Sequence, residues 1–154
     1  MKDLRGSATG VTTAPVDECA RFFLAVDRYP TWHPEVVRTV EVLDRDAECE
    51  PTRARAVLHV AVGPLVKDFD LVLASALADP RTVKLTRVPN HPGDDERFDV
   101  TWRLEEGPRT ARMRTSIRLE VEASLSVPRF LPVGGIGDGL AQGFVSAATR
   151  ALGA

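Results

Sequence analysis

The sequence is poor in the features that mark many specialised classes of protein. Its 154 residues contain two cysteines, Cys19 and Cys49, without metal-binding spacing. The 20 lysines and arginines against 22 aspartates and glutamates give a net charge of -2, which provides no overall basic field for nucleic acid or an anionic membrane. No stretch approaches the roughly 18 apolar residues of a membrane span, and MKDLRGSATG lacks the apolar core of a signal peptide. We therefore expect a cytoplasmic globular protein with free thiols, no nucleic-acid partner and no stable membrane insertion.

The first third of the chain shows a change of hydrophobic period. Residues 3–13 predict a weak strand that contains Gly6 and Gly10. Residues 15–27 predict an amphipathic helix, because apolar residues recur at spacings of three and four: Val16, Cys19, Ala20, Phe23 and Val26. Pro30 and Pro34 then allow at most a short helical turn within 28–37.

From residue 36 to 123 the period is that of strands, and two Gly-Pro pairs predict tight hairpins. Gly63-Pro64 suits a two-residue turn, because glycine supplies the positive φ and proline's fixed φ follows. That turn pairs Val62 with Leu65, Leu58 with Phe69, Ala56 with Leu71 and His59 with Asp68. Gly107-Pro108 predicts a second such turn, with these pairs: Leu104–Ala111, Trp102–Met113, Val100–Thr115, Phe98–Ile117, Arg103–Arg112 and Thr101–Arg114. Both hairpins keep one apolar face, which predicts an antiparallel meander.

The last predicted element is a long amphipathic helix over residues 132–152. Its apolar stripe consists of Val133, Ile136, Leu140, Phe144, Ala147 and Ala151. A sheet with one apolar face needs a cover, and this helix is the natural candidate. The sequence therefore predicts an α+β protein, with residues 1–154 forming one domain.

The element order, and the segment APVDECARFFLAVDRYPTWHPEVV at 14–37, resemble the START-like (SRPBCC) superfamily. The resemblance is carried by Ala14-Pro15 opening the first helix, by Asp27-Arg28-Tyr29-Pro30, and by Trp32 and Pro34. It implies a helix-grip fold, in which a curved antiparallel sheet of about seven strands wraps around a long C-terminal helix, with two short helices after the first strand. The superfamily includes polyketide cyclases and dehydrases, lipid-transport and coenzyme Q-binding proteins and pollen-allergen-type proteins. Its members bind sterols, lipids, quinones, hormones or polyketides, and some are enzymes.

The inward-facing residues are almost all apolar, as in most pockets for small ligands. We therefore expect an internal cavity that binds a small hydrophobic or amphipathic molecule, such as a lipid, quinone or polyketide-like compound. Trp32, His33 and Thr115 are the expected orienting groups, and we expect no metal and no cofactor. The full predicted site is Trp32, His33, Leu58, Phe69, Leu71, Phe98, Val100, Trp102, Met113, Thr115, Gly137, Leu140, Gly143 and Phe144.

Three of these residues have two interpretations each. Trp32 either fixes the short turn against the sheet or borders the cavity mouth together with His33. Gly137 and Gly143 lie on the predicted inner side of the terminal helix. They either leave space for a ligand or let the helix backbone approach the strands closely.

Other polar clusters suggest chemistry less strongly. The pair His59–Asp68 lies on the polar face of its hairpin, which favours an exposed cross-strand pair over a catalytic dyad. A solvated loop is the better interpretation of the possible metal ligands His91, Asp94, Asp95 and Glu96, which lack a recognised spacing. Glycines 134, 135, 137 and 139 do not match a nucleotide-binding motif. Arginines 109, 112, 114 and 118 lie on the predicted outer sheet face among glutamates, which is typical of a solvated surface.

Two alternatives to a binding protein remain open at this stage. The first is a polyketide aromatase/cyclase or dehydratase, which needs a general acid or base beside the ligand. The assigned inward faces offer only Thr115 and His33 for this role. The second is a module that docks on a protein partner, or on a second copy, through its sheet edge, and a filled core without a cavity would favour it.

Overall fold

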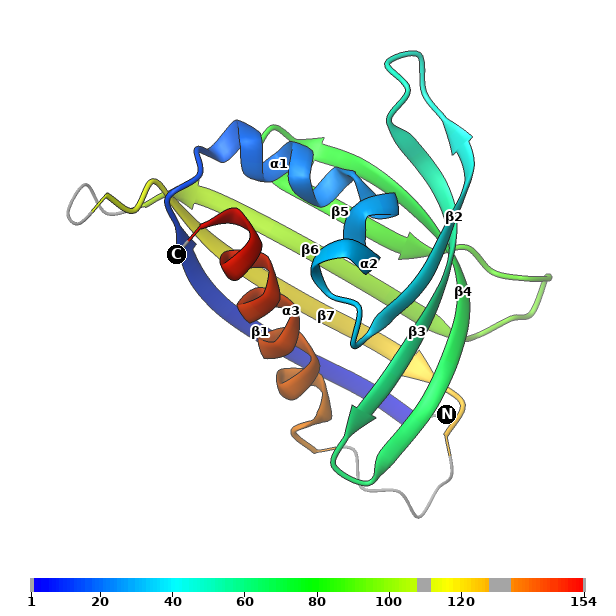
Figure 1. The fold of residues 1–154 in the computed structure, drawn as a ribbon. Coiled ribbons are helices and arrows are strands. Elements are labelled where there is room, and N and C mark those ends of the chain that lie inside the picture. The colour runs from blue at the N-terminus through cyan, green and yellow to red at the C-terminus, as the bar shows by residue number, and fades with distance from the viewer. Residues whose placement is uncertain (1, 108–111, 128–133, 154) are drawn as a thin grey trace.

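The structure is a computed structural model that describes residues 2–107, 112–127 and 134–153. Within these residues the elements follow in this order: β1 (Lys2–Thr12), α1 (Val16–Leu24), the 3₁₀ turn η1 (Val26–Arg28), α2 (Tyr29–Trp32), β2 (Val37–Arg45), β3 (Pro51–Val62), β4 (Leu65–Asp79), β5 (Thr82–Arg87), β6 (Arg97–Glu106), β7 (Thr115–Leu125) and α3 (Ile136–Leu152). The strands form one antiparallel sheet in the order β1-β7-β6-β5-β4-β3-β2 (Figure 1).

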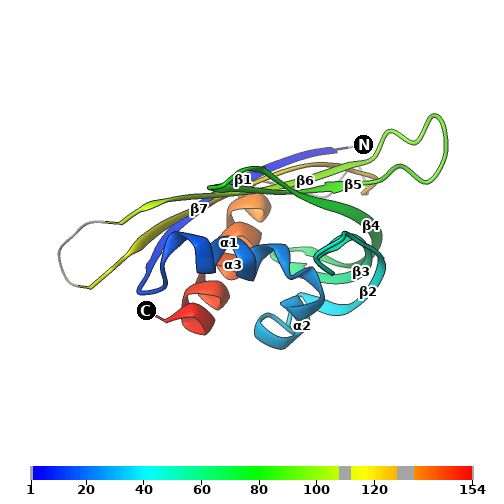
Figure 2. The ribbon, with the colours of Figure 1, turned by 90° about the horizontal axis from the view of Figure 1, so that it is seen from above.

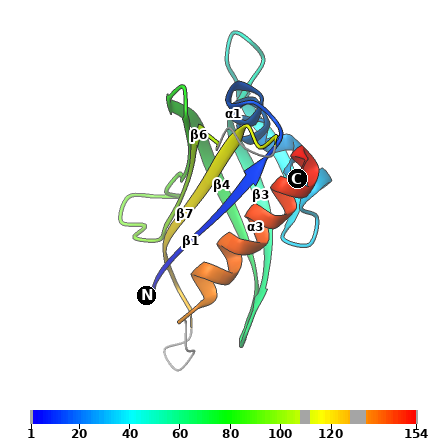
Figure 3. The same ribbon diagram turned by 90° about the vertical axis from the view of Figure 1, so that its left-hand side faces the viewer.

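All the helices lie on one face of this curved sheet, as the view from above shows (Figure 2). Helix α3 runs alongside β1 at one edge of the sheet (Figure 3). Helix α1 lies over β6, β5 and β4, and α2 lies beside β2. The concave face of the sheet is therefore covered by α3 on the β1 side and by α1 and α2 on the other. This arrangement confirms the α+β helix-grip fold that the sequence predicts.

The first predicted helix is shorter than its hydrophobic period suggests. It begins after Pro15, with Asp17 and Glu18 in the first turn, and ends at Leu24 instead of continuing to residue 27. Ala25 leaves the helical conformation (φ -77°, ψ 68°), and the chain re-enters a 3₁₀ turn at Val26. The predicted short helical turn after it is present as α2.

The hairpin between β3 and β4 has the predicted register. Val62 pairs with Leu65, Leu58 with Phe69 and Ala56 with Leu71. Gly63 has a φ of +58°, the left-handed conformation that glycine adopts at little cost.

The predicted register of the hairpin between β6 and β7 is wrong. Leu104 pairs with Ile117, Trp102 with Leu119, Val100 with Val121 and Phe98 with Ala123; on the outer face Arg103 pairs with Arg118 and Thr101 with Glu120. The pair Glu106–Thr115 closes the ladder, so the connection is longer than the two residues expected at Gly107-Pro108, and residues 108–111 lie outside the described part. The observed register places the fully buried Ile117 and Leu119 opposite Leu104 and Trp102, in place of Ala111 and Met113. The shift is even, so each strand keeps its predicted inner face.

Helix α3 begins at Ile136, later than the predicted residue 132, while 132 and 133 lie outside the described residues. Gly135 precedes it with a left-handed φ of 81°. The exposed Ala151 does not belong to the buried face, which consists of Ile136, Gly137, Leu140, Ala141, Phe144, Val145, Ala147 and Ala148. None of the helices in the described ranges is long and apolar enough to cross a membrane.

Candidate ligand-binding site

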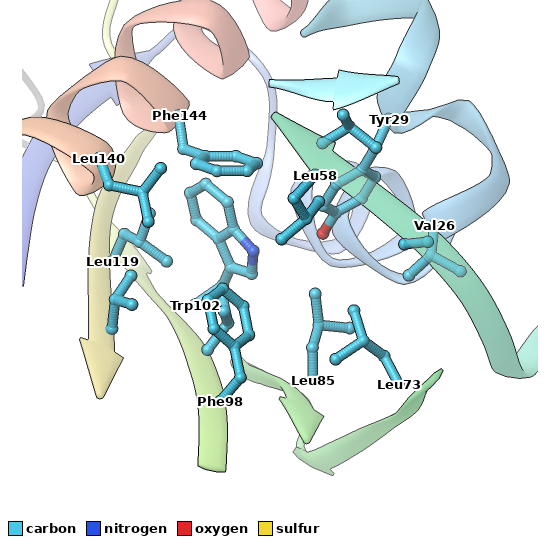
Figure 4. A pocket seen from close by; sticks show the side chains of 14 residues that line it. Val26, Tyr29, Leu58, Leu73, Leu85, Phe98, Trp102, Leu119, Leu140 and Phe144 are labelled. Carbon is cyan, nitrogen blue, oxygen red and sulfur yellow. The ribbon is translucent and has the colours of Figure 1, made fainter. Parts of the chain in front are cut away.

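A small internal cavity lies between the concave face of the sheet and the helices. Its volume is about 40 Å³, enough for a few water molecules. Its walls come from η1, α2, α3 and every strand except β1 (Figure 4): Val26, Tyr29, Val37, Ala56, Leu58, Leu73, Leu85, Phe98, Val100, Trp102, Leu119, Val121, Leu140 and Phe144. The described lining contains no carboxylate and no cationic side chain.

Two residues of this lining, Trp102 and Tyr29, carry a polar side-chain atom, and neither atom is exposed to the cavity. Trp102 is fully buried, and its ring stacks on Phe23 with centroids 3.8 Å apart. Its indole Nε1 has no hydrogen-bond partner of normal geometry among the described residues. The Tyr29 hydroxyl donates to the Phe23 carbonyl at 2.7 Å. Burial raises the pKa of Tyr29 far above its ordinary value, and the nearby Trp102 N–H opposes that rise.

A second set of aromatic side chains closes the cavity on the side where α2 approaches α3. The Trp32 ring lies 4.7 Å from Tyr29, and the His33 ring lies 4.6 Å from Phe144, measured between centroids. The Trp32 and His33 rings are nearly parallel, with centroids 6.0 Å apart. Gly143 faces His33, since a Cβ on Gly143 would lie 3.9 Å from His33 Nε2. We call Trp32, His33, Gly143 and Phe144 the cap.

The cap contains buried polar atoms that make no hydrogen bond to any described residue. Trp32 Nε1 and His33 Nε2 are both shielded from solvent and have no hydrogen-bond partner among the described residues. His33 is only 7% exposed. Burial lowers the pKa of His33 below its ordinary value of 6.5, and Arg150 acts in the same direction, while Glu35 opposes them. The imidazole is therefore neutral near physiological pH.

The structure brings six of the predicted site residues together at the cavity: Leu58, Phe98, Val100, Trp102, Leu140 and Phe144. Trp32 and His33 lie one layer farther out, in the cap. The remaining predictions do not line the cavity. Phe69 and Leu71 are core residues elsewhere on the inner face, and Met113 lines an open groove beside the α1 N-terminus. The Thr115 hydroxyl is buried and donates to the Ala14 carbonyl at 2.6 Å, so it does not face the cavity.

Gly137 and Gly143 in α3 take one each of the two roles that the sequence left open. A Cβ on Gly137 would collide with the backbone of Arg5 and Gly6 in β1. Gly137 therefore serves close packing and does not hold space for a ligand. Gly143 has room for a methyl group and faces the cap.

The sequence prediction omitted eight lining residues: Val26, Tyr29, Val37, Ala56, Leu73, Leu85, Leu119 and Val121. Alternation is enough to place Ala56, Leu73 and Leu85 on the inner face of the sheet. It does not show which positions along a strand lie at the cavity and which lie in filled core. Leu119 and Val121 were missed because the predicted register of β6 and β7 paired other residues with Trp102 and Val100. Tyr29 was missed because it lies in a four-residue helix, which is too short for a hydrophobic period to show which way its side chains point.

The polar clusters outside the cavity have structural roles. His59 Nδ1 lies 2.6 Å from Asp68 Oδ1 on the outer face, with the exposure expected of a cross-strand pair. Asp94 is held by the buried Arg87 at 2.8 Å and by the backbone N–H of Asn90, and the Arg87 guanidinium holds the pKa of Asp94 well below its usual range. This carboxylate therefore fixes the loop between β5 and β6. No group of three or more potential metal ligands is present in the described ranges.

The outer arginines form ion pairs on the solvated sheet face. Arg103 and Arg118 both reach Glu120, at 3.0 and 3.2 Å. Arg112 and Arg114 line the open groove beside α1, and Arg109 lies outside the described residues.

Comparison with known families agrees with this architecture. Residues 13–149 match the family described as polyketide cyclase/dehydrase and lipid transport. The chain belongs to this family. No curated protein matches the chain by sequence.

Solved structures with the fold of this family member share little sequence with it. A START superfamily protein from Mycobacterium smegmatis has 13% identity and a TM-score of 0.73, with 96% of each chain covered. The Zhui aromatase/cyclase from a Streptomyces species has 16% identity and a TM-score of 0.59, covering 98% of this chain and 94% of that one. A major latex-like protein from Panax ginseng has 8% identity and a TM-score of 0.60, covering 96% and 93%. At these identities the structures establish the fold and not the activity.

Proposed function

We propose that the protein binds a small hydrophobic or amphipathic molecule in the internal cavity. The observation that carries this proposal is an internal cavity whose described surface is apolar. Most small-molecule sites are lined mainly by hydrophobic and aromatic side chains. Membership of a family that includes lipid-transport proteins supports the same conclusion.

The cavity must enlarge to receive a ligand. Its volume of about 40 Å³ is far below the roughly 300–1,000 Å³ of typical ligand sites. The free-energy cost of enlarging the cavity is lowest where the surrounding backbone and polar groups make the fewest hydrogen bonds and contacts. At the cap, α2 has only four residues, two buried nitrogens lack hydrogen-bond partners in the part of the chain that the structure describes, and Gly143 leaves room for a methyl group. Trp32 and His33 thus act in the proposal as movable walls at the mouth of the cavity.

Binding is better supported than catalysis. Cyclisation or dehydration needs a general acid or base within reach of the ligand. Tyr29 is the only titratable group in the described lining, and its raised pKa and its hydrogen bond to Phe23 make it a poor acid at neutral pH. The aromatase/cyclase alternative therefore has no acid or base in place in this closed state.

A protein-docking role through the sheet edge receives less support. The edge strand β2 has register irregularities between Val37 and Thr39, between Val42 and Asp44, and between Asp44 and Arg45. Such bulges protect an edge from pairing with another strand. We further propose a cytoplasmic location, because Cys19 and Cys49 are unpaired.

The proposal is tested by titrating the protein with the uncharged fluorescent dye N-phenylnaphthylamine. We expect saturable binding of about one molecule per chain, without unfolding. The variant Ala56→Val adds two carbons to the cavity wall and should weaken binding severalfold. Ala74→Val makes the same change on the exposed face of the neighbouring strand β4 and should leave binding unchanged. Dye binding that does not saturate, or that both variants weaken equally, would contradict an internal site.

A further inference from the structure

The cap contains a buried histidine that is held mainly by contacts between rings. The His33 ring lies 4.6 Å from that of Phe144, measured between centroids, and its backbone N–H donates to the Tyr29 carbonyl at 2.8 Å. His33 is only 7% exposed, yet its Nε2 has no hydrogen-bond partner in the part of the chain that the structure describes. The imidazole therefore joins α2 to α3 without a hydrogen bond from that nitrogen.

The same ring contacts close the cavity. Phe144 and Tyr29 line the cavity (Figure 4), and the rings of His33 and Trp32 pack on them from outside. On the α3 side His33 Nε2 faces Gly143, which has no side chain to bind it or to block its movement. Movement of the His33 ring away from Phe144 therefore uncovers a wall of the cavity and breaks no side-chain hydrogen bond of His33 within the described residues.

The surroundings of His33 accept a neutral ring and resist a charged one. The charged groups that act on it within the described chain are Glu35, in the turn after α2, and Arg150, in the last turn of α3. The rings of Trp32 and Phe144 that pack on it are uncharged. Burial, the largest effect, and Arg150 lower the pKa of His33, while Glu35 raises it, so this pKa lies below its ordinary value of 6.5 while the cap is closed.

We propose that His33 is a pH-sensitive latch, whose protonation opens the cap and speeds both the entry and the release of the cavity's ligand. In the open cap, water hydrates the charged ring, so a proton binds the open form more tightly than the closed form. By linkage, acid therefore increases the population of the open form at pH values below about 6.5. This inference rests on the binding function proposed above and adds a control on ligand exchange.

The test follows the exchange of N-phenylnaphthylamine by stopped-flow fluorescence as the pH is lowered from neutral to about 5. The nitrogen of this diarylamine does not titrate in that range. We expect the association and dissociation rates to rise together by about threefold or more, because both steps pass through the open cap, while the equilibrium affinity changes little. The rise should begin near pH 6.5 and level off below the pH at which the His33 ring itself titrates in NMR spectra.

The chain contains three histidines, so three single glutamine variants account for all of them. His33→Gln removes the titrating group and should make both rates nearly independent of pH. His59→Gln and His91→Gln are matched controls that should keep the wild-type acceleration, since His59 pairs with Asp68 on the outer face and His91 is exposed in the loop between β5 and β6. These two variants also assign the histidine resonances. Where His33→Gln folds poorly, agreement between the wild-type rate profile and the titration of the His33 ring carries the test.

The outcomes separate the two proposals. Three results with saturable dye binding overturn the latch and leave the binding function standing: rates that do not change with pH, faster release without faster entry, and a His33 ring that titrates at pH 6.5 or above. An acceleration that persists in His33→Gln also overturns the latch. Absence of saturable dye binding at every pH overturns the binding function, and the latch with it.

Discussion

Helix α3 has two sides that are built differently. On the β1 side, Gly6 and Gly137 let helix and strand backbones touch. The N–H of Ser7 donates to Asp138 at one end, and Gly153 accepts from Thr12 and Thr13 at the other. On the cap side, Gly143 faces His33 across a looser contact, and two buried nitrogens have no partners in the described structure. The difference indicates that α3 is anchored to β1, and we propose that the cavity opens at the cap.

The largest expected effect comes from filling the anchored side. Gly137→Ala should lower the free energy of unfolding by about 3 kcal/mol or more, because the methyl group meets fixed backbone of Arg5 and Gly6. The gain in helix propensity, roughly 1 kcal/mol, does not offset this. Urea denaturation of the purified variant measures the loss. A variant as stable as wild type would show that α3 can shift on β1.

The next effect concerns the hydrogen bond at the start of α3. Asp138→Ala removes the 3.0 Å acceptor of the Ser7 N–H and a negative charge from the first helical turn. We expect a loss of about 1 kcal/mol in thermal or urea unfolding. Asp138→Asn keeps an oxygen acceptor and should recover part of the loss. Equal destabilisation by both variants would mean that charge, and not the hydrogen bond, matters at this end.

A smaller effect of opposite sign is expected at the cap. Gly143→Ala places its methyl at ordinary contact distance from His33, so helix propensity should raise stability by roughly 0.5 kcal/mol. It is the matched control for Gly137→Ala, since the helix and the substitution are the same. Destabilisation of both variants would remove the distinction between the two sides.

The smallest expected effect is a pH dependence at the cap. Because burial lowers the pKa of His33 in the folded protein, the unfolded chain binds the proton first as pH falls through the ordinary value of 6.5. Wild-type stability should therefore decline toward acid pH more steeply than that of His33→Gln. Unfolding curves of the two proteins at several pH values measure the difference, in which contributions common to both proteins cancel. Parallel curves would show that His33 is solvated in the folded state.

Much of the fold could be predicted because the relevant signals are local. Alternation along the strands identified their inner faces, and Gly63 fixed the β3–β4 register through its turn. The β6–β7 register failed because a glycine-proline pair favours a short turn locally, whereas the packing of Ile117 and Leu119 against Leu104 and Trp102 decides the pairing.

The site was harder to predict than the fold for a related reason. An apolar strand residue reads the same in sequence whether it lines a cavity, as Leu85 does, or packs in filled core, as Leu71 does. Alternation placed the Thr115 side chain on the inner face of the sheet. Its hydroxyl is instead used by the Ala14 carbonyl, and a partner so distant in the chain could not be predicted from the sequence. The roles of Gly137 and Gly143 can be distinguished only in the folded structure, which places β1 against Gly137 and His33 opposite Gly143.

Native-state hydrogen exchange tests most directly whether the cavity opens at the cap. The amides of His33 and Val37, which donate to Tyr29 and His33, report the cap. The amides of Ser7 and Thr13, which donate to Asp138 and Gly153, report the anchored side. We expect the cap amides to open with the lower free energy, and N-phenylnaphthylamine to protect them while leaving Ser7 and Thr13 unchanged. Opening of the Ser7 and Thr13 amides at the lower free energy, with protection by the dye confined to them, would place the mouth of the cavity between α3 and β1 and contradict this account.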